Sequence, residues 1–303
     1  MGEMLAYLNG AYIPHSECKL FVFDLGIVLG AAVTDFTRTF NGVPYRIEDH
    51  VERLYRSCKY TYLKPKQTKE ETIEISKKLV EHNSEVMPGK EWGIIYYITG
   101  GVNTIYAGGA ALPDDLECTY VQHTFPMPFH LWRDIFTKGI HCVTPAHRHF
   151  PPQCLSSKIK NRNRLHMWVG AKEAALADPN AMALYLDING FITETGGSNF
   201  LIYKDGKVIS PKPPNILWGI SLQTVTEILK DMGVEFIMDD ITAYDAVNSE
   251  EAFVPTSPYC LGPVTKINGN IIGDGKPGRL WREILDRWSR IVDKDIYNEM
   301  TGA

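Results

Sequence analysis

The sequence has 303 residues and a formal net charge of −5 at pH 7, from 31 lysines and arginines against 36 aspartates and glutamates. This acidic balance argues against a nucleic-acid-binding protein, which needs a basic surface. Hydrophobic residues make up 44% of the chain and charged residues 22%, values that exclude a disordered protein. The length suits one large or two medium domains.

Six cysteines lie far apart without a C-x-x-C pair, and the nine histidines contain no H-E-x-x-H motif, so no metal site is expected. The first residues, MGEMLAYLNG, lack the basic and apolar regions of a signal peptide. No apolar run reaches the roughly 18 residues that a membrane span needs. We expect a reduced, cytoplasmic protein without a membrane partner.

The first half of the chain reads as strands interrupted by a helix. Strands are predicted at 5–13, 36–40, 43–47, 92–99 and 118–124. The second and third are joined by Asn41-Gly42, a dipeptide that supplies the positive φ angles of a two-residue hairpin turn. Thr68-Lys69-Glu70-Glu71 is a capping box, and it begins a helix that we expect to reach about Asn83.

The second half combines three hairpins with three helices. The hairpins are predicted at Asn189-Gly190, Asp205-Gly206 and Asn268-Gly269. The helices are expected at about 163–177, from Ser221 to before Gly233, and at about 278–294, and their apolar stripes are typical of core positions.

Two prolines without a clear period mark residues 123–130 as a linker. We therefore expect an α+β protein with an N-terminal α+β domain at 1–122 and a mixed, mostly antiparallel C-terminal domain at 131–303.

Four cations, Lys158, Lys160, Arg162 and Arg164, lie close together in this acidic chain. Composition alone favours a solvated corner between a strand and a helix. On a strand Lys158 and Lys160 would point the same way, so alternation does not distinguish the two lysines.

Three downstream segments carry groups that bind anions or flat ligands. Glu194 is followed by Gly196-Gly197, where the backbone can approach a ligand closely. Ser221 lies at the expected start of a helix, where an anion is favoured, and a loop hydroxyl pair follows at Thr256-Ser257. Taken singly, these are explained as a turn carboxylate, an N-cap and a turn. Together, an amine, a carboxylate, an anion cradle and hydroxyls are the groups that pyridoxal phosphate needs.

Several short motifs occur in an order that resembles the class IV (fold type IV) pyridoxal-phosphate aminotransferases. They are Phe23-Asp24-x-Gly26-x-x-x-Gly30, Asp49-His50-x-x-Arg53-Leu54, Lys160-x-x-Asn163, Thr193-Glu194-x-Gly196-x-Ser198-Asn199 and Gly219-Ile220-Ser221. This family includes branched-chain and D-amino-acid aminotransferases, (R)-selective amine transaminases and aminodeoxychorismate lyase. The resemblance runs from about Tyr7 to Arg282. It implies a smaller N-terminal α/β sandwich, a larger C-terminal mixed β-barrel-like domain with helices, and a homodimer.

The resemblance also implies a role for individual residues. Lys160 matches the Schiff-base lysine, Arg53 the phosphate-binding arginine, and Glu194 the acid that faces the pyridine nitrogen. The remaining cofactor-binding residues that it implies are Ser198, Asn199, Gly219, Ile220, Ser221, Thr256 and Ser257. For Arg53 the residues alone favour an ion pair on a helix surface.

The chain departs from its relatives where the substrate binds. It has Thr99-Gly100-Gly101 where D-amino-acid aminotransferases have Thr-Arg-Gly, and Thr34 where a tyrosine is expected. The substrate carboxylate would need another cation, with Arg38, Arg162 and Arg164 as candidates, or backbone amides. An amine substrate would need neither. Arg38 faces either the site or solvent.

The resemblance predicts an aminotransferase that moves an amino group between an amino acid or primary amine and a 2-oxo acid. Lys160-x-x-Asn163-Arg164-Leu165 is also close to the aminodeoxychorismate lyases, which eliminate pyruvate, so a lyase is the alternative. A cofactor-binding protein without turnover is a third reading. The presence of both Lys160 and Glu194 argues against it.

Overall fold

The computed structural model describes residues 2–105 and 116–302, and the chain divides into two compact units. The first unit consists of Met1–Met127 and Ile159–Asn163, and the second of Pro128–Lys158 and Arg164–Ala303. The prediction of a linker from residue 123 is wrong in part, because Tyr120–Pro126 forms a strand of the first unit. The short segment 159–163, which carries Lys160, also belongs to the first unit.

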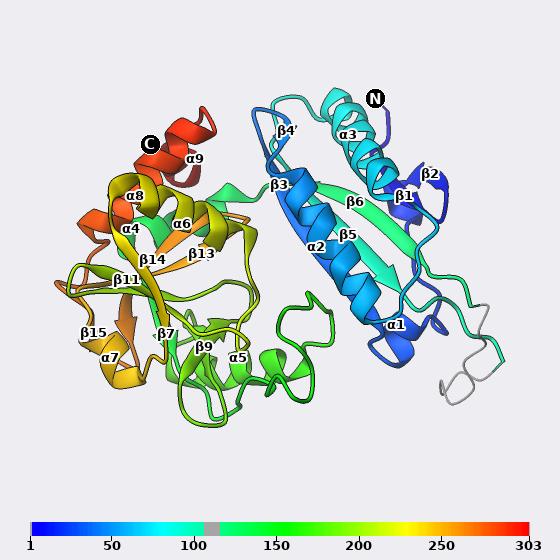
Figure 1. Cartoon of the computed structure of the whole chain (residues 1–303). Helices are drawn as coiled ribbons and strands as arrows, with labels where there is room; N and C mark the ends of the chain where they lie inside the picture. Colours follow the sequence, from blue (N-terminus) through cyan, green and yellow to red (C-terminus); the bar gives the residue numbers. More distant parts are fainter. Residues whose placement is uncertain (1, 106–115, 303) are drawn as a thin grey trace. The chain divides into compact units, whose positions relative to one another are not determined.

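The first unit is built on a six-stranded sheet in which each pair of neighbours is antiparallel. The strand order is β2-β1-β6-β5-β3-β4, and the bounds are β1 (Leu5–Leu8), β2 (Ala11–Pro14), β3 (Ala32–Phe40), β4 (Val43–Pro44), β5 (Trp92–Thr99) and β6 (Tyr120–Pro126). Its helices are the short η1 (His15–Glu17) and α1 (Leu25–Val28) and the longer α2 (Ile47–Tyr60) and α3 (Lys69–Val86). Figure 1 shows α2 lying along β3, which carries several residues of the candidate site.

The two long helices of the first unit differ in how they could be predicted. The predicted capping box is formed, because the side chains of Thr68 and Glu71 both make its hydrogen bonds. Thr68 is the N-cap, and α3 begins at the residue after it, Lys69. Helix α2 follows Arg46, a left-handed residue whose side chain makes no capping hydrogen bond. The usual capping signal of a helix start is therefore absent at α2.

The second unit contains a nine-stranded mixed sheet in the order β12-β11-β10-β13-β14-β7-β8-β9, with β15 paired to β14. The strands are β7 (Ile140–Val143), β8 (Met182–Leu186), β9 (Ile192–Thr195), β10 (Leu201–Lys204), β11 (Lys207–Pro211), β12 (Glu235–Asp239), β13 (Glu251–Thr256), β14 (Cys260–Ile267) and β15 (Asn270–Ile271). The α+β fold that the resemblance implies is confirmed.

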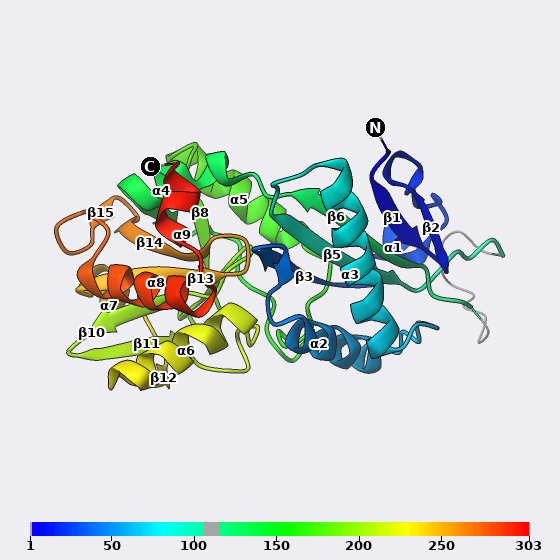
Figure 2. The same cartoon turned by 90° about the horizontal axis from the view of Figure 1, so that it is seen from above.

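Helices pack around this second sheet. They are η2 (Phe129–Trp132), α4 (Arg133–Lys138), α5 (Leu165–Ala177), α6 (Ile220–Met232), α7 (Ala243–Val247), α8 (Arg279–Ile291) and α9 (Ile296–Thr301). Helix α6 packs against α8 and β13 (Figure 2). Both tryptophans of α8, Trp281 and Trp288, are buried. Among the described residues, no helix combines the length and apolar character that crossing a membrane requires.

The hairpin turns follow the dipeptide signals with one exception. Asn41, Asp205 and Asn268 all have the positive φ angles expected of a two-residue turn. At Asn189-Gly190 only the glycine has a positive φ angle. This connection is longer than a two-residue turn, and the Asp187 carboxylate closes it by accepting hydrogen bonds from the amides of Asn189 and Phe191. The predicted strand at 5–13 is also a hairpin, β1–β2, which turns at Asn9-Gly10.

Candidate active site

Lys160 is held by its backbone on β3 and α2 of the first unit. Its carbonyl oxygen accepts a 2.8 Å hydrogen bond from the Thr34 amide, and its own amide donates over 3.3 Å to the hydroxyl of Ser57. The next residue, Asn161, forms a bridge with Val33, also on β3. Two elements of one unit therefore determine where the backbone of Lys160 lies.

The two candidate lysines differ in their surroundings. Lys158 lies in a turn and is exposed, whereas Lys160 is partly buried. The alternation argument for a strand did not apply because the segment before Lys160 is a turn. Exposure, rather than the direction along a strand, separates the two side chains.

Arg53 forms a buried ion pair instead of the surface pair that the residues alone favour. Its Nε and Nη2 donate to the two carboxylate oxygens of Asp35, each over 2.8 Å, and 5% of Arg53 is exposed. His50, one helical turn before Arg53, places its Nδ1 2.7 Å from Oδ1 of Asp35. His50 and Arg53, which are three positions apart on α2, therefore both bond to the Asp35 carboxylate on β3.

The charges of this cluster follow from its burial. Burial alone would raise the pKa of the Asp35 carboxyl, but Arg53 and His50 outweigh it and hold this pKa well below its usual range. Burial, together with the positive charges of Arg53 and Lys160, lowers the pKa of His50 by more than Asp35 raises it. His50 is therefore neutral near pH 7, and its Nδ1–H donates to Asp35.

Glu194, on β9 in the second unit, accepts hydrogen bonds at both carboxylate oxygens. Oε2 accepts from the Leu217 amide at 3.1 Å and from the side-chain amide of Asn199 at 3.4 Å. Oε1 lies 3.4 Å from Nε2 of His149. Donors from three separate segments thus fix the orientation of this carboxylate.

His149 supports Glu194, and none of the sequence motifs includes it. Its Nδ1 lies 3.1 Å from the carbonyl oxygen of Phe150, so both ring nitrogens face acceptors and the ring needs both protons. Burial lowers the pKa of His149, but the Glu194 carboxylate and the Phe150 carbonyl together outweigh it, and the net pKa is raised. No motif could have identified this pair, because 45 residues separate its members.

Asn199 and Gly219 fit closely together beside Glu194. The Asn199 side chain donates over 2.7 Å to the Leu217 carbonyl, which joins the loop after β9 to the segment before α6. A Cβ atom at position 219 would lie 2.3 Å from Oδ1 of Asn199. Glycine at 219 is therefore a packing requirement of this contact.

Helix α6 begins one residue earlier than predicted, which changes the interpretation of Ser221. Gly219 is the N-cap and provides no side-chain hydrogen bond, so Ser221 is not a cap. Its hydroxyl instead lies 3.4 Å from that of Ser257. Two hydroxyls and the first amides of a thirteen-residue helix thus occur together, an arrangement that favours an anion.

The remaining cofactor-binding candidates form the neighbouring loop. The hydroxyl of Thr256 donates over 3.2 Å to the carbonyl of Gly197. The Ser198 amide donates over 3.0 Å to the hydroxyl of Thr195, which tightens the turn after β9. The loop that carries Ser257 is thereby connected to the segment that follows Glu194.

The candidate substrate residues lie in different environments. Arg38 is 1% exposed, stacks on Phe40 at 4.1 Å and donates through Nε to the Thr39 carbonyl, so it does not face solvent. Thr34 is buried, and its hydroxyl donates to the Tyr96 carbonyl over 2.7 Å. Arg164, in the second unit, reaches the Gly196 carbonyl at 3.4 Å.

The absence of an arginine at position 100 has a packing explanation. A Cβ atom on Gly100 would lie 3.2 Å from Cδ1 and 3.3 Å from Cβ of Leu25, the first residue of α1. The Gly100 amide also donates to the Ala31 carbonyl over 3.0 Å. A side chain at this position would therefore begin in tight contact with α1, and Leu25 would have to shift.

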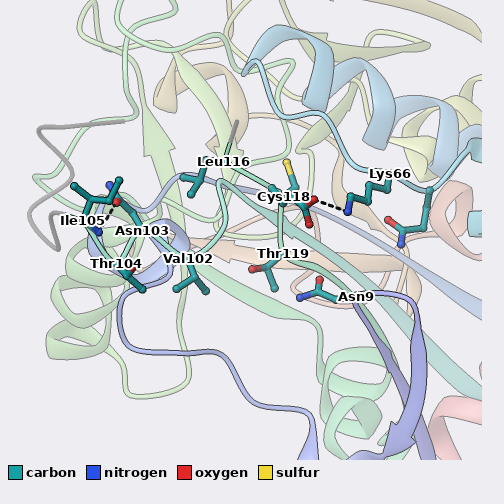
Figure 3. Close-up of a pocket in the computed structure, with 11 residues that line it drawn as sticks. Asn9, Lys66, Val102, Asn103, Thr104, Ile105, Leu116, Cys118 and Thr119 are labelled. Atoms are coloured by element: carbon teal, nitrogen blue, oxygen red, sulfur yellow. Dashed lines mark hydrogen bonds and ion pairs between the residues drawn. The ribbon is translucent and has the colours of Figure 1, made fainter. Parts of the chain in front are cut away.

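A pocket of about 470 Å³ lies elsewhere in the first unit, and none of the predicted site residues lines it. Lys66 and Glu117 both line it and form a 2.6 Å ion pair. Figure 3 shows the Lys66 side chain among the residues that line the pocket. Asn9, Asn103 and Thr119 contribute polar groups to its wall. Ile105 also lines the pocket, and residues 106–115, which follow it in the chain, lie outside the described residues.

Comparison with known proteins assigns the chain to a family. The family model Amino-transferase class IV matches residues 32–267. A putative branched-chain-amino-acid aminotransferase from Methanocaldococcus jannaschii is 28% identical over 98% of this chain and 100% of its own. A D-alanine aminotransferase from Staphylococcus aureus is 30% identical over 95% of this chain and 97% of its own.

Solved structures show the same fold. A branched-chain amino acid aminotransferase from Escherichia coli superimposes with a TM-score of 0.88 at 20% identity, covering 96% of this chain and 95% of the other. A second branched-chain amino acid aminotransferase, complexed with N-(5'-phosphopyridoxyl)-L-glutamate, gives 0.86 at 23% identity, covering 98% and 97%. Neither these relatives nor the described residues favour the lyase alternative. The chain belongs to the class IV aminotransferases.

Proposed function

We propose that this aminotransferase uses pyridoxal phosphate, with Lys160 as the residue that binds the cofactor aldehyde covalently. The anchored backbone and partial burial of Lys160 support this assignment over Lys158, which is exposed. Glu194 is proposed to face the pyridine nitrogen. Arg53, Ile220 and Ser221, with the hydroxyl of Ser257, are proposed to bind the phosphate.

The residues present fit this cofactor. Helix α6 starts without a side-chain cap, so its first amides have no cap oxygen, and the hydroxyls of Ser221 and Ser257 lie 3.4 Å apart beside them. A phosphate needs donors of this kind. The carboxylate of Glu194, fixed by three donors, is an acceptor for a ring N–H. The oriented carboxylate is the observation that best supports pyridoxal chemistry over simple phosphate binding.

The protein residues divide the chemistry among them. When bound, the cofactor provides an electron-withdrawing ring that stabilises negative charge at the substrate Cα. The ε-amine of Lys160, in its neutral form, is proposed to remove the proton from the substrate Cα and to return it at C4′ of the cofactor, a general acid–base role. Glu194 would keep a proton on the ring nitrogen of the bound cofactor, and Asn199 and His149 hold the Glu194 carboxylate in place.

An amino acid or primary amine is the proposed donor and a 2-oxo acid the proposed acceptor. Because Gly100 has no side chain to bind it, the carboxylate of an amino acid must be bound by another group. Arg164 is the proposed cation, since its side chain reaches the Gly196 turn that follows Glu194. Arg38 and Thr34 are proposed to shape the site from the first unit.

A homodimer is proposed on the exposed apolar side chains. In the first unit Phe21, Phe23 and Ile27 are exposed, and in the second unit Trp168 and Leu176 are. Such residues are typical of surfaces that a partner covers. A clean monomer mass for the active protein in light scattering would contradict the dimer. A cytoplasmic location stays a prediction.

Paired variants test the cofactor assignment. Lys160→Ala is expected to abolish the absorbance of the bound cofactor and transamination together. Lys158→Ala, which replaces the lysine two residues before it, is expected to retain both the cofactor absorbance and transamination. Loss of both properties in Lys158→Ala alone would show that the wrong lysine has been chosen. Half-reactions with L-amino acids, D-amino acids and (R)-amines would then identify the donor class.

A further inference from the structure

Asp35 is a buried carboxylate to which the motifs assign no role. It lies in the middle of β3, has no exposed surface, and faces α2. Its Oδ1 accepts from Nη2 of Arg53, from the ring of His50 and from the Phe36 amide, and its Oδ2 accepts from Nε of Arg53. A carboxylate is rarely buried without such partners, and here the partners include a residue of the candidate site.

The geometry of the pair determines how the guanidinium is oriented. Two parallel hydrogen bonds of 2.8 Å join the Nε/Nη2 edge of Arg53 to both oxygens of Asp35. A bidentate pair of this kind fixes the guanidinium plane as well as its position. His50 fixes the carboxylate in turn, since its pKa is lowered by burial and its neutral ring donates to Oδ1.

The same helix face is connected to Lys160. Ser57, one turn after Arg53, donates over 3.0 Å to the Arg53 carbonyl and accepts from the Lys160 amide at 3.3 Å. The Thr34 amide, one residue before Asp35, donates to the Lys160 carbonyl. The carboxylate, the guanidinium and the backbone of the proposed cofactor lysine thus belong to one hydrogen-bonded arrangement.

We propose that Asp35 is a positioning residue for phosphate recognition, which holds the Arg53 guanidinium ready to bind the phosphate of the cofactor. The proposal rests on the proposed function, because it takes Arg53 as a phosphate-binding residue. Asp35 also has an opposing effect, since its negative charge repels a phosphate. Orientation outweighs repulsion in this proposal, because a loose arginine would have to be ordered at each binding event.

Two ligands that differ in the phosphate alone test this proposal. The full-length protein, stripped of cofactor, is titrated with pyridoxal phosphate and with pyridoxal. Asp35→Asn retains the size of the side chain and removes one of the two acceptors that Arg53 needs. We expect it to weaken pyridoxal phosphate binding about tenfold or more. We expect pyridoxal binding to stay within about twofold.

Arg53→Ala provides the second half of the test. In this background Asp35→Asn is expected to cause no further loss that is specific to the phosphate ligand. Glu91→Gln is the matched control, because Glu91 is another buried carboxylate of the first unit but bonds to Thr39 and the Asn41 turn. It is expected to lower the melting temperature without changing the ratio of the two affinities.

Two results would overturn the proposal. Equal weakening of both ligands by Asp35→Asn would show a purely structural role, and tighter pyridoxal phosphate binding would show that repulsion dominates. If Asp35→Asn does not fold, His50→Leu takes its place, because it removes one hydrogen bond to the same carboxylate. This variant must then show a smaller loss of affinity for pyridoxal phosphate and no loss of affinity for pyridoxal. Borohydride labelling of Lys160 in the wild type tests the proposed function separately: labelling together with equal losses contradicts the Asp35 proposal alone.

Discussion

At the scale of single residues, the candidate site depends on contacts between segments that are distant in the chain. Asp35 meets Arg53 across 18 residues, and His149 meets Glu194 across 45. The motifs identify Arg53 and Glu194 but neither of their supports. A support residue has no local pattern, because its role arises from the position of another segment in the folded protein.

Gly219 provides a prediction at this scale. Gly219→Ala places a methyl group 2.3 Å from Oδ1 of Asn199, so that either the amide or the start of α6 must move. We expect a loss of about 1–3 kcal/mol in the free energy of unfolding, together with weaker cofactor binding. Chemical denaturation and cofactor titration measure the two effects. Gly196→Ala is the matched control for stability, because no neighbouring segment lies within 4 Å of a Cβ there; an equally large loss of unfolding free energy in this control would contradict the packing argument.

His149 provides a prediction on pH dependence. The pKa of His149 is raised above its ordinary value of 6.5, so its pairing with Glu194 stabilises the fold most below about pH 6.5 and the gain is lost as the pH rises through the folded-state value. The melting temperature of His149→Gln should therefore fall furthest below that of the wild type near pH 5.5 to 6, with the gap narrowing toward pH 8. Thermal melts across this range measure it, and a gap that widens with pH would contradict the assigned charge.

Gly100 allows a test by gain of a side chain. Gly100→Arg introduces the arginine that the resemblance leads us to expect at this position in D-amino-acid aminotransferases, but its Cβ would lie 3.2 Å from Cδ1 of Leu25, which would have to shift. We expect about 1–3 kcal/mol of destabilisation and no improvement in KM for amino-acid donors. A stable variant with a lower KM would show that the space at position 100 is available for a substrate-binding arginine.

At the scale of elements, local signals succeed where the determinants are local. The capping box of α3, the glycine at the end of α6 and three of the four predicted dipeptide turns are present as expected. Helix α2 lacks a side-chain cap and is held instead by packing on β3 and α3. The Asn189-Gly190 connection departs from a two-residue turn because the Asp187 carboxylate bonds to backbone amides across it.

The capping box separates stability from function. Thr68→Ala removes the hydrogen bond to the Glu71 amide and should cost about 1 kcal/mol of unfolding free energy. Because α3 bears no proposed site residue, cofactor affinity should be unchanged. Thr226→Ala, which replaces a threonine inside α6, is the control. Denaturant titration measures the unfolding free energy of both variants, and equal losses of unfolding free energy would contradict the assigned role of the cap.

At the scale of the whole molecule, the resemblance in the sequence identified the family, and the structure divides the proposed site residues between two units. The units themselves were harder to delimit from the sequence. The segment 159–163 follows a part of the second unit in the chain but pairs with β3 of the first. A boundary drawn along the sequence cannot represent a segment that crosses back to an earlier sheet.

The proposed chemistry depends on one covalent bond, between the ε-nitrogen of Lys160 and the aldehyde of the cofactor. Borohydride reduction of the cofactor-saturated protein, followed by peptide mass spectrometry, is the decisive experiment. We expect a phosphopyridoxyl adduct on Lys160 and none on Lys158. An adduct on Lys158 alone, or an unmodified Lys160 in protein saturated with cofactor, would refute the assignment.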